Sequence, residues 1–322
     1  MANPLLVDVD TGVDDALALL FLARHPELEI LGVTCVAGNT DVDRVVRNTL
    51  DVLHLAGAGS VPVARGADRP LIEPRRPASG FHGEDGLAGY SLPLSPHPAS
   101  PLPAVEFMKW AIDESADPVT LLALGPLTNV ALFLRLYPER ASRLERIVFM
   151  GGSAGVGNAT AVAEFNIWHD PEAAAIVLDA PVPVIMYGLD VFYEPAVGVR
   201  DIAALGDSAD AALRLAAALL SHSVSLESDD PRLAFGGLLG DAGAACYVAD
   251  PRLVVTGIFP SSIELAPGAG RGQTIVDRRN SPGESEQHFG SKKDRRMEVA
   301  MTVDAHDMEH LFLETIRKEV AL

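Results

Sequence analysis

Residues 5–16 read Leu-Leu-Val-Asp-Val-Asp-Thr-Gly-Val-Asp-Asp-Ala, and this stretch decides the fold. Its apolar start is typical of a buried β-strand over Leu5–Val9 that ends at Asp10. Gly12 permits a sharp turn, and the residues from 13 to 24 have the composition of a helix. A strand, a tight turn and a helix in this order predict the first unit of a parallel α/β sheet.

The same rhythm of short apolar runs and helical patterns recurs along the chain and predicts one Rossmann-like α/β domain over residues 1–322. We expect a mainly parallel central sheet with helices on both faces. Further strands are expected at 30–36, 119–124, 147–150 and 182–186, and helices at 41–56, after Gly125-Pro126, at 170–179, 208–226 and 304–319. Long loops, which are either functional lids or disordered segments, are expected at about 65–103, 227–240 and 267–296.

Composition narrows the classes of partner. The 322 residues are 48% hydrophobic, which is enough for a sizeable core, and the net charge of −19 makes nucleic acid and anionic membranes poor partners. Two cysteines, Cys35 and Cys246, exclude a disulfide scaffold and fit a reducing compartment. No basic segment precedes the first apolar run and no apolar run is long enough to span a bilayer, so the protein is expected to be cytoplasmic.

Four carboxylates, Asp8, Asp10, Asp14 and Asp15, crowd the junction of the first strand and helix. Ligand sites of parallel sheets lie at the carboxyl ends of strands, and carboxylates this close repel each other unless a cation neutralises them. The cluster therefore predicts a divalent metal site. Helix capping by Thr11 and Asp14 is the alternative, and the spacing does not match an EF-hand loop.

The segment from Asp8 to Ala16 resembles the N-terminal signature of the inosine-uridine preferring nucleoside hydrolases. Other segments resemble that family in the same order along nearly the whole chain, so the resemblance implies a nucleoside hydrolase-like fold. They are Gly38-Asn39-Thr40, His82–Leu87, Gly125–Asn129, Met150-Gly151-Gly152, Gly157-Asn158, Ala163–Asn166, Asp241 and Arg271–Asp277.

The resemblance also implies roles for individual residues. Ca²⁺ would bind the carboxylates of Asp10, Asp15 and Asp241 and the backbone carbonyl of Leu124. Asp10 would take a proton from the attacking water, with Asp14 and Asn166 acting beside it on the sugar. The ribose would contact Asp14, Asn39, Met150, Asn158, Glu164 and Asn166. A calcium ion with four protein ligands has room for a water and two sugar hydroxyls, which favours ribonucleosides over deoxyribonucleosides. Taken singly, each of these residues could instead be a turn, surface or core residue.

The sequence departs from the family pattern immediately before Asp241. Many members that accept pyrimidines have a histidine there and some purine-specific members a tryptophan, whereas this chain has Gly240. The group that assists the leaving base is therefore unassigned. His82, His222 and Trp168 are the candidates for contact with the base, and Tyr193 and Phe235 are weaker options.

We therefore expect a Ca²⁺-dependent hydrolase that splits the N-glycosidic bond of ribonucleosides into free base and ribose. A hydrolase of another N-ribosyl compound is one alternative, and Gly240 keeps it open. A ribose- or nucleoside-binding protein with little turnover is another, although binding alone does not require a base such as Asp10 beside the water. The resemblance further implies a homodimer or homotetramer.

Overall fold

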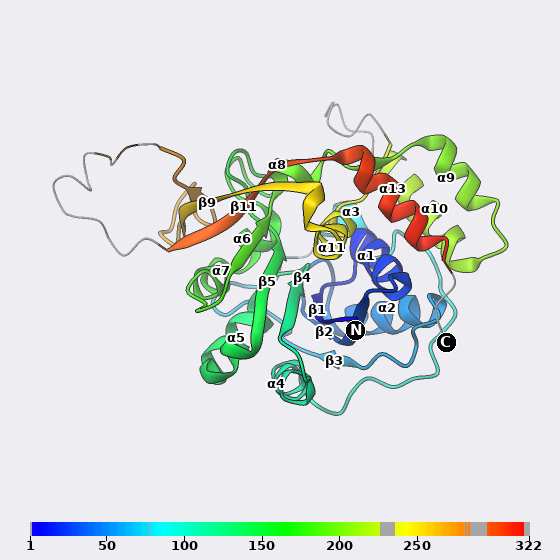
Figure 1. The fold of residues 1–322 in the computed structure, drawn as a ribbon, viewed down its shortest axis with the longest axis horizontal. Helices are drawn as coiled ribbons and strands as arrows, with labels where there is room; N and C mark the ends of the chain where they lie inside the picture. The colour runs from blue at the N-terminus through cyan, green and yellow to red at the C-terminus, as the bar shows by residue number, and fades with distance from the viewer. Residues whose placement is uncertain are drawn as a thin grey trace.

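The computed structural model describes residues 2–76, 78–225, 236–279, 281, 283 and 295–318. Its centre is a sheet of nine strands, in which every neighbouring pair from β11 to β3 is parallel (Figure 1). Strands β9 and β10 complete the sheet in antiparallel fashion at one edge. In spatial order the strands are β10 (Thr274–Val276), β9 (Val254–Ile263), β11 (Arg296–Val303), β6 (Val184–Tyr187), β5 (Leu144–Met150), β4 (Val119–Ala123), β1 (Asn3–Val9), β2 (Leu28–Cys35) and β3 (Val63–Arg65).

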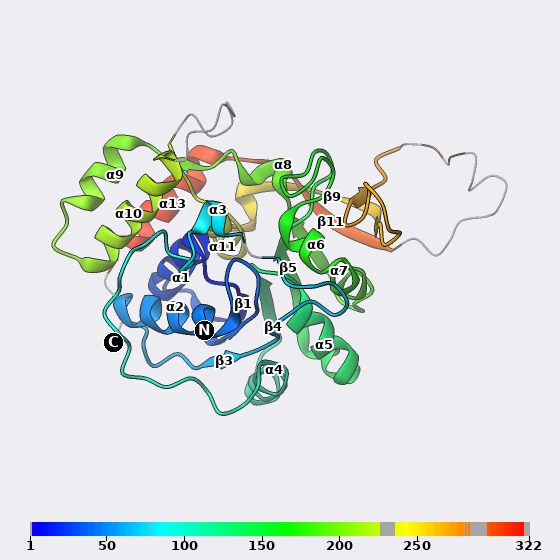
Figure 2. The same cartoon turned by 180° about the vertical axis from the view of Figure 1, so that it is seen from behind.

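Helices cover both faces of the sheet because alternate strand residues point to opposite sides and both sets are apolar. Leu5, Val7 and Val9 enter one core, whereas Leu6 enters the other. The first core is closed by α1 (Val13–Arg24), α2 (Val42–Leu55), α10 (Ala211–Ser225), α11 (Asp241–Ala249) and α13 (Ala305–Ile316). The second is closed by α4 (Ala104–Glu114), α5 (Thr128–Leu136) and α7 (Pro171–Val177), which lie on the other side of the sheet (Figure 2).

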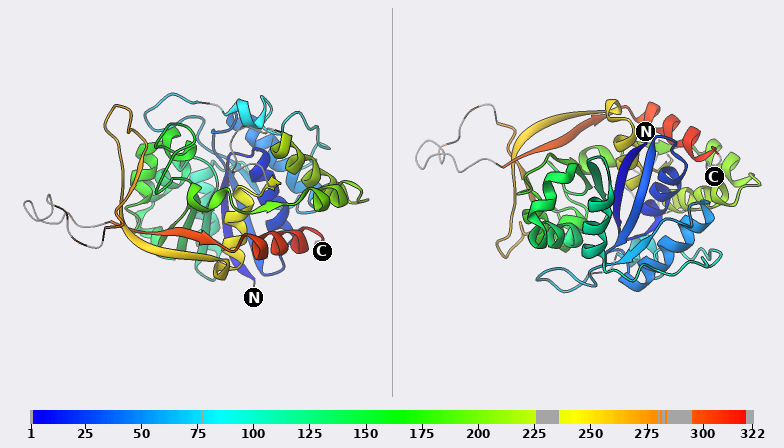
Figure 3. Two further views of the ribbon diagram at one scale, coloured as in Figure 1. Left: turned by 90° about the horizontal axis from the view of Figure 1, so that it is seen from above. Right: turned by 60° about the horizontal axis from the view of Figure 1, so that its bottom comes forward.

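Short helices and 3₁₀ turns connect the longer elements. The helices are α3 (Ser79–His82), α6 (Phe165–His169), α8 (Leu189–Phe192) and α9 (Val199–Gly206), with 3₁₀ turns η1 (Pro138–Arg143) and η3 (Pro251–Leu253). A separate two-stranded ribbon joins β7 (Ala196–Val197) to β8 (Gly237–Leu238). Strands β9 and β11 extend beyond the parallel strands as an arm, which both views of Figure 3 display. Among the described residues, no helix combines the length and apolarity that crossing a membrane requires.

The predicted α/β class, mainly parallel sheet and two helical layers are confirmed. Helix α1 has the predicted limits, and β1 begins at Asn3, two residues earlier than expected. The loop expected at 65–103 is irregular apart from α3, and the one at 267–296 includes β10. Residues 227–235 of the loop expected at 227–240, and 280, 282 and 284–294 of the loop expected at 267–296, lie outside the described residues.

Candidate active site

A cavity of about 320 Å³ opens at the carboxyl ends of β1, β2, β4 and β5. This is the edge at which ligand sites of parallel sheets are found, and the volume suits a small molecule. Ten of the residues singled out from the sequence line it, although they are spread over more than 230 positions of the chain. They are Asp10, Asp14, Asn39, His82, Leu124, Met150, Asn158, Glu164, Asn166 and Asp241.

Asp10 is buried at the end of β1 because two glycines let the backbone pass close to its carboxylate. A Cβ atom at Gly38 would lie 2.0 Å from Asp10 Oδ2, and one at Gly125 would lie 2.7 Å from Oδ1. The backbone N–H of Asn39 donates to Asp10 Oδ2 at 2.8 Å. Larger residues at these two positions would displace the carboxylate, so the segments after β2 and β4 fix its orientation.

Asp15, and not Asp14, caps helix α1. The Asp15 carboxylate accepts hydrogen bonds from the backbone N–H groups of Gly12 at 2.9 Å and Asp10 at 3.2 Å, and Gly12 is the N-cap residue. Thr11 instead shares a hydrogen bond with Thr49 at 2.6 Å. The capping alternative that paired Thr11 with Asp14 is therefore wrong, because the helix begins one residue later than that pairing requires.

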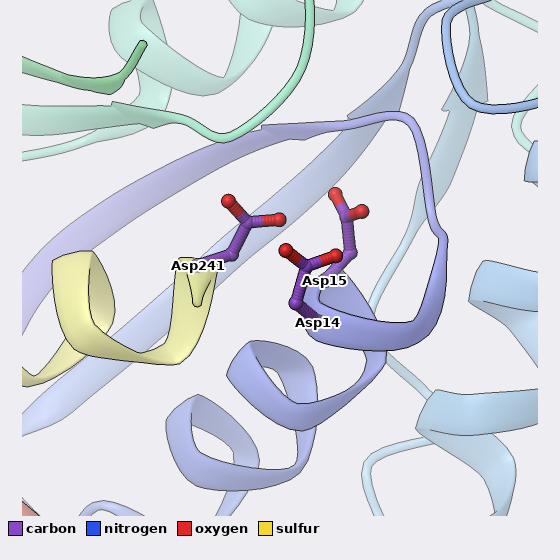
Figure 4. Close-up of side chains that lie close together, drawn as sticks. All are labelled: Asp14, Asp15 and Asp241. Carbon is purple, nitrogen blue, oxygen red and sulfur yellow. The ribbon is translucent and has the colours of Figure 1, made fainter. Parts of the chain in front are cut away.

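The carboxylates of Asp14, Asp15 and Asp241 point toward one another across the first turns of α1 and α11 (Figure 4). One oxygen from each lies within 4.8 Å of the others. Asp14 Oδ1 is buried and accepts no hydrogen bond from any described residue. Such a group of oxygen donors fits a hard divalent cation. Asp10, which the sequence prediction placed on the metal, is not a member of this group but faces the same cavity.

Burial and mutual repulsion raise the pKa values of the whole cluster. Burial raises the pKa of Asp14 and of Asp15 to about 6, and the charge of Asp14 contributes to the shift of Asp15. Burial and then repulsion from neighbouring aspartates raise the pKa values of Asp10 and Asp241 well above the usual range. Burial also raises the pKa of Glu164 to about 7. Charging these groups together is unfavourable, and a bound cation would offset that cost.

These shifts predict how stability depends on pH. Because folding raises the pKa of Asp14 and Asp15 from 3.8 to about 6, the folded chain holds more protons than the unfolded chain between those values. With a chelator present, Tm should therefore fall by at least several degrees as the pH rises from about 4 to about 7, since each pKa unit is worth about 1.4 kcal/mol.

Thermal unfolding followed by fluorescence measures this dependence. Adding Ca²⁺ at neutral pH should restore the lost Tm, whereas NaCl at equal ionic strength should restore much less, because these carboxylates are shielded from bulk ions. A Tm that rises with pH in the chelator would contradict the repulsion that we describe.

Glu164 and Asn166 reach the cavity from the start of α6. Glu164 is the N-cap of this helix and accepts hydrogen bonds from the backbone N–H groups of Gly152, Asn166 and Ile167 at 2.8–3.1 Å. The amide of Asn166 donates to the carbonyls of Leu124 at 2.7 Å and Met150 at 3.1 Å. Helix α6 thus holds both side chains against the ends of β4 and β5. Asn158 is exposed and accepts a hydrogen bond from Phe165 N at 2.9 Å.

The three candidates for contact with the base lie in different surroundings. His82 lines the cavity, and its Nδ1 accepts a hydrogen bond from Val13 N at 3.1 Å, so the ring is a neutral tautomer with its proton on Nε2. Burial lowers the pKa of His82 to about 4, which keeps it neutral despite Asp14 at 3.9 Å. His222 contacts the carbonyl of Phe81 at 2.8 Å behind the cavity lining. Trp168 also lies outside the lining, with Arg76 stacked 4.3 Å from its ring centre.

Asn129 is a site-supporting residue that the sequence interpretation did not assign. Its side chain is fully buried and donates to Asp8 Oδ1 at 2.8 Å and to the Cys35 carbonyl at 3.0 Å, while its oxygen accepts the N–H of Ala67. It therefore ties the ends of β1, β2 and β3 to helix α5. Its position, six residues after the end of β4 and three residues after the Gly125-Pro126 turn, is the signal that could have marked it.

The aromatic residues of the cavity lining were also largely missed, because a sequence pattern cannot separate them from core residues. They are Phe81 in α3, Phe165 at the start of α6, and Phe192 and Tyr193 at the end of α8. Tyr193 was a weak option in the sequence, and Phe235 lies outside the described residues.

The chain is similar in sequence to a known protein family and to proteins of known activity. A model of the family described as inosine-uridine preferring nucleoside hydrolase matches residues 5–310. The chain is 39% identical to the pyrimidine-specific ribonucleoside hydrolase RihA of Shewanella sp. strain ANA-3 over 309 residues, which cover 95% of this chain and 96% of that protein.

Solved structures with similar folds carry related descriptions. A plant nucleoside hydrolase, the PpNRh1 enzyme, matches with a TM-score of 0.88 and 26% identity, covering 98% of this chain and 99% of its own. A purine-preferring ribonucleoside hydrolase from Gardnerella vaginalis matches with a TM-score of 0.87 and 30% identity, covering 98% of each chain.

Proposed function

Because the chain belongs to the inosine-uridine preferring nucleoside hydrolase family, we propose that it hydrolyses the N-glycosidic bond of ribonucleosides in a Ca²⁺-dependent reaction. The observation that carries this proposal is the convergence of acidic and amide side chains from the ends of four strands in one cavity. Asp10, Asp15, Asp241 and the Leu124 carbonyl would hold the ion. When bound, Ca²⁺ supplies a Lewis acid that acidifies water and attracts vicinal hydroxyls.

Asp10 is the general base of the proposed reaction. Water attacks the anomeric carbon of the ribose, and Asp10 takes its proton. The carboxylate is held by the Asn39 N–H and by the close backbones of Gly38 and Gly125, so it needs no rearrangement to accept the proton. Such pre-organisation lowers the barrier because the cost of orienting the base is met on folding.

The remaining polar side chains bind the sugar. Asn39 and Asn158 can donate to and accept from a vicinal diol, since each amide carries both kinds of group. Asn166 offers its amide oxygen as an acceptor, because its nitrogen donates to the Leu124 and Met150 carbonyls. Asp14 and Glu164 accept hydrogen bonds from hydroxyls, and their negative charge stabilises the oxocarbenium-like transition state. Met150 packs against the sugar from the end of β5. His82, with its proton on Nε2, can donate to the base or to a hydroxyl.

Release of free ribose from a panel of uridine, cytidine, inosine and adenosine, with Ca²⁺ present, tests the proposal. One relative is named pyrimidine-specific and one structural neighbour purine-preferring, so the panel needs both classes. Matching 2′-deoxyribonucleosides are the control, and they should react far more slowly. Tight nucleoside binding without ribose release from any member would contradict hydrolysis and favour a binding protein.

We further propose that the chain works in the cytoplasm as a homodimer or homotetramer, as the family resemblance implies. Light scattering coupled to size-exclusion chromatography measures the mass in solution, and a 34.0 kDa particle would contradict the oligomer.

Gly240 offers a sharper test of how the site is built. Its φ of +55° and ψ of −124° suit glycine, and a Cβ atom there would lie 2.7 Å from the Asp14 side chain. Gly240→Ala should therefore lower kcat/KM by about tenfold or more, because local strain of this kind costs about 1–3 kcal/mol. Gly240→His should lose at least as much, although a histidine could in principle protonate the base. A gain in turnover on nucleosides with poor leaving groups would contradict the predicted displacement of Asp14.

A further inference from the structure

The cavity is lined by two chemically distinct sets of side chains. The carboxylates of Asp10, Asp14 and Asp241 come from the end of β1 and the first turns of α1 and α11. The aromatic side chains of Phe192 and Tyr193 line the same cavity. A nucleoside has the same division, with a polyhydroxylated sugar joined to a flat aromatic base. Once the sugar contacts the carboxylates, the base must contact other residues of the lining.

Gly240 cannot supply such a contact. It has no side chain, and the space that a Cβ atom would enter is already filled by Asp14. The base must therefore contact residues from other segments of the lining.

The β7–β8 ribbon brings such a segment alongside. Ala196 pairs with Leu238 in antiparallel register, and Leu239 N donates to the Pro195 carbonyl at 3.1 Å. Tyr193 lies three residues before β7 and Gly240 lies two residues after β8, so both flank the same end of the ribbon, and both line the cavity.

Helix α8, which carries this aromatic pair, is tied to the sugar side of the cavity. Leu189 N donates to the Gly152 carbonyl at 2.9 Å, and Ala154 N donates to Asp190 Oδ2 at 2.8 Å. The Phe192 and Tyr193 rings meet edge to face, with centroids 5.1 Å apart. These contacts hold the pair in place before any ligand arrives, so little ordering entropy is lost on binding.

We propose that Phe192 and Tyr193 form the wall that contacts the nucleobase and determine base specificity. The inference rests on the proposed ribonucleoside hydrolysis and adds which residues contact the base. Ring contact with the Tyr193 face, and not donation by its hydroxyl, supplies the interaction. An N-ribosyl compound with a small non-aromatic leaving group would gain no binding free energy from contact with these two rings.

Tyr193→Ala and Phe192→Ala test the proposal, with Tyr193→Phe as the variant that keeps the ring. Tyr90→Ala is the matched control, because Tyr90 is 40% exposed and lies outside the cavity lining. Two readouts are needed: kcat/KM for uridine and inosine, and equilibrium binding of uridine, inosine and free ribose by calorimetry. Thermal unfolding checks that each variant is folded.

The alanine variants should weaken uridine or inosine binding about tenfold, the size of a lost base–aromatic contact, and should shift the ratio between the two. Ribose binding should stay unchanged. Tyr193→Phe should retain most of the nucleoside binding that Tyr193→Ala loses, and Tyr90→Ala should resemble the wild type. Equal losses for ribose and nucleoside, no loss in either alanine variant, or a Tyr193→Phe loss as large as that of Tyr193→Ala would each overturn the inference. A wild type that binds nucleosides without releasing ribose would instead contradict the proposed hydrolysis, and the binding ratios would still decide the role of the wall.

Discussion

Asp10→Asn should lower kcat by about 10²- to 10⁴-fold, the range for loss of a positioned general base. Asparagine keeps the size of the side chain, and its oxygen can still accept the Asn39 N–H that holds Asp10 at 2.8 Å. The amide cannot take a proton from water at neutral pH. The loss should therefore appear in kcat, while sugar binding through Asn166 and Glu164 is retained.

A second readout separates loss of the base from loss of the fold. Removing one charge from the crowded carboxylates relieves repulsion, so the Tm of Asp10→Asn in chelator should equal or exceed that of the wild type. Asp207→Asn, an exposed residue just after α9, is the control for a change of net charge. Initial rates of ribose release measure kcat. Turnover of the Asp10 variant within tenfold of wild type would show that another group takes the proton.

The sequence predicts the Asp10 region well because local and global signals agree there. The apolar run, the glycine and the helical pattern each require the same strand, turn and helix, and α1 has the expected limits. Which aspartate caps the helix could not be predicted, since the choice depends on whether the turn begins at Thr11 or Gly12. Thr49 decides it by forming a hydrogen bond with Thr11 from another helix, at a sequence separation of 38 residues.

Long-range packing also explains why the antiparallel strands and the aromatic cavity residues could not be predicted from the sequence. Strands β9 and β11 pair in antiparallel fashion beyond the parallel sheet, and β9 carries Gly257 and Pro260, which weaken a strand pattern. Trp168 looked like a base-stacking candidate because it follows the sugar-binding segment. In the fold its ring lies against Arg76, outside the cavity lining, while Phe192 and Tyr193 reach the cavity from the end of α8, a short helix that no local pattern marks.

Removal of divalent metal should reduce ribose release to the background rate, and added Ca²⁺ should restore it. The reason is electrostatic. Oxygens of Asp14, Asp15 and Asp241 lie within 4.8 Å of one another in a buried site, and Asp10 faces the same cavity. Without a cation, the raised pKa values of these groups favour protonation, and a protonated Asp10 cannot act as a base. Metal loss therefore disables the attacking water, the sugar site and the base together.

The ion and the site can be identified by the same titration. Ca²⁺ accommodates six to eight oxygen ligands in irregular geometry, whereas Mg²⁺ requires a near-octahedral shell and gives up water reluctantly. We therefore expect Ca²⁺ to restore activity at lower concentration than Mg²⁺.

Asp241→Asn should raise the Ca²⁺ concentration needed for half-maximal activity by about tenfold or more. The reason is that it removes a charged ligand whose carboxylate points toward those of Asp14 and Asp15 (Figure 4). Asp207→Asn should leave that concentration unchanged. Full activity in chelator would contradict the proposed metal site, because the reaction would then proceed without a bound cation. An unaltered calcium requirement in Asp241→Asn would show that this carboxylate is not a ligand of the ion.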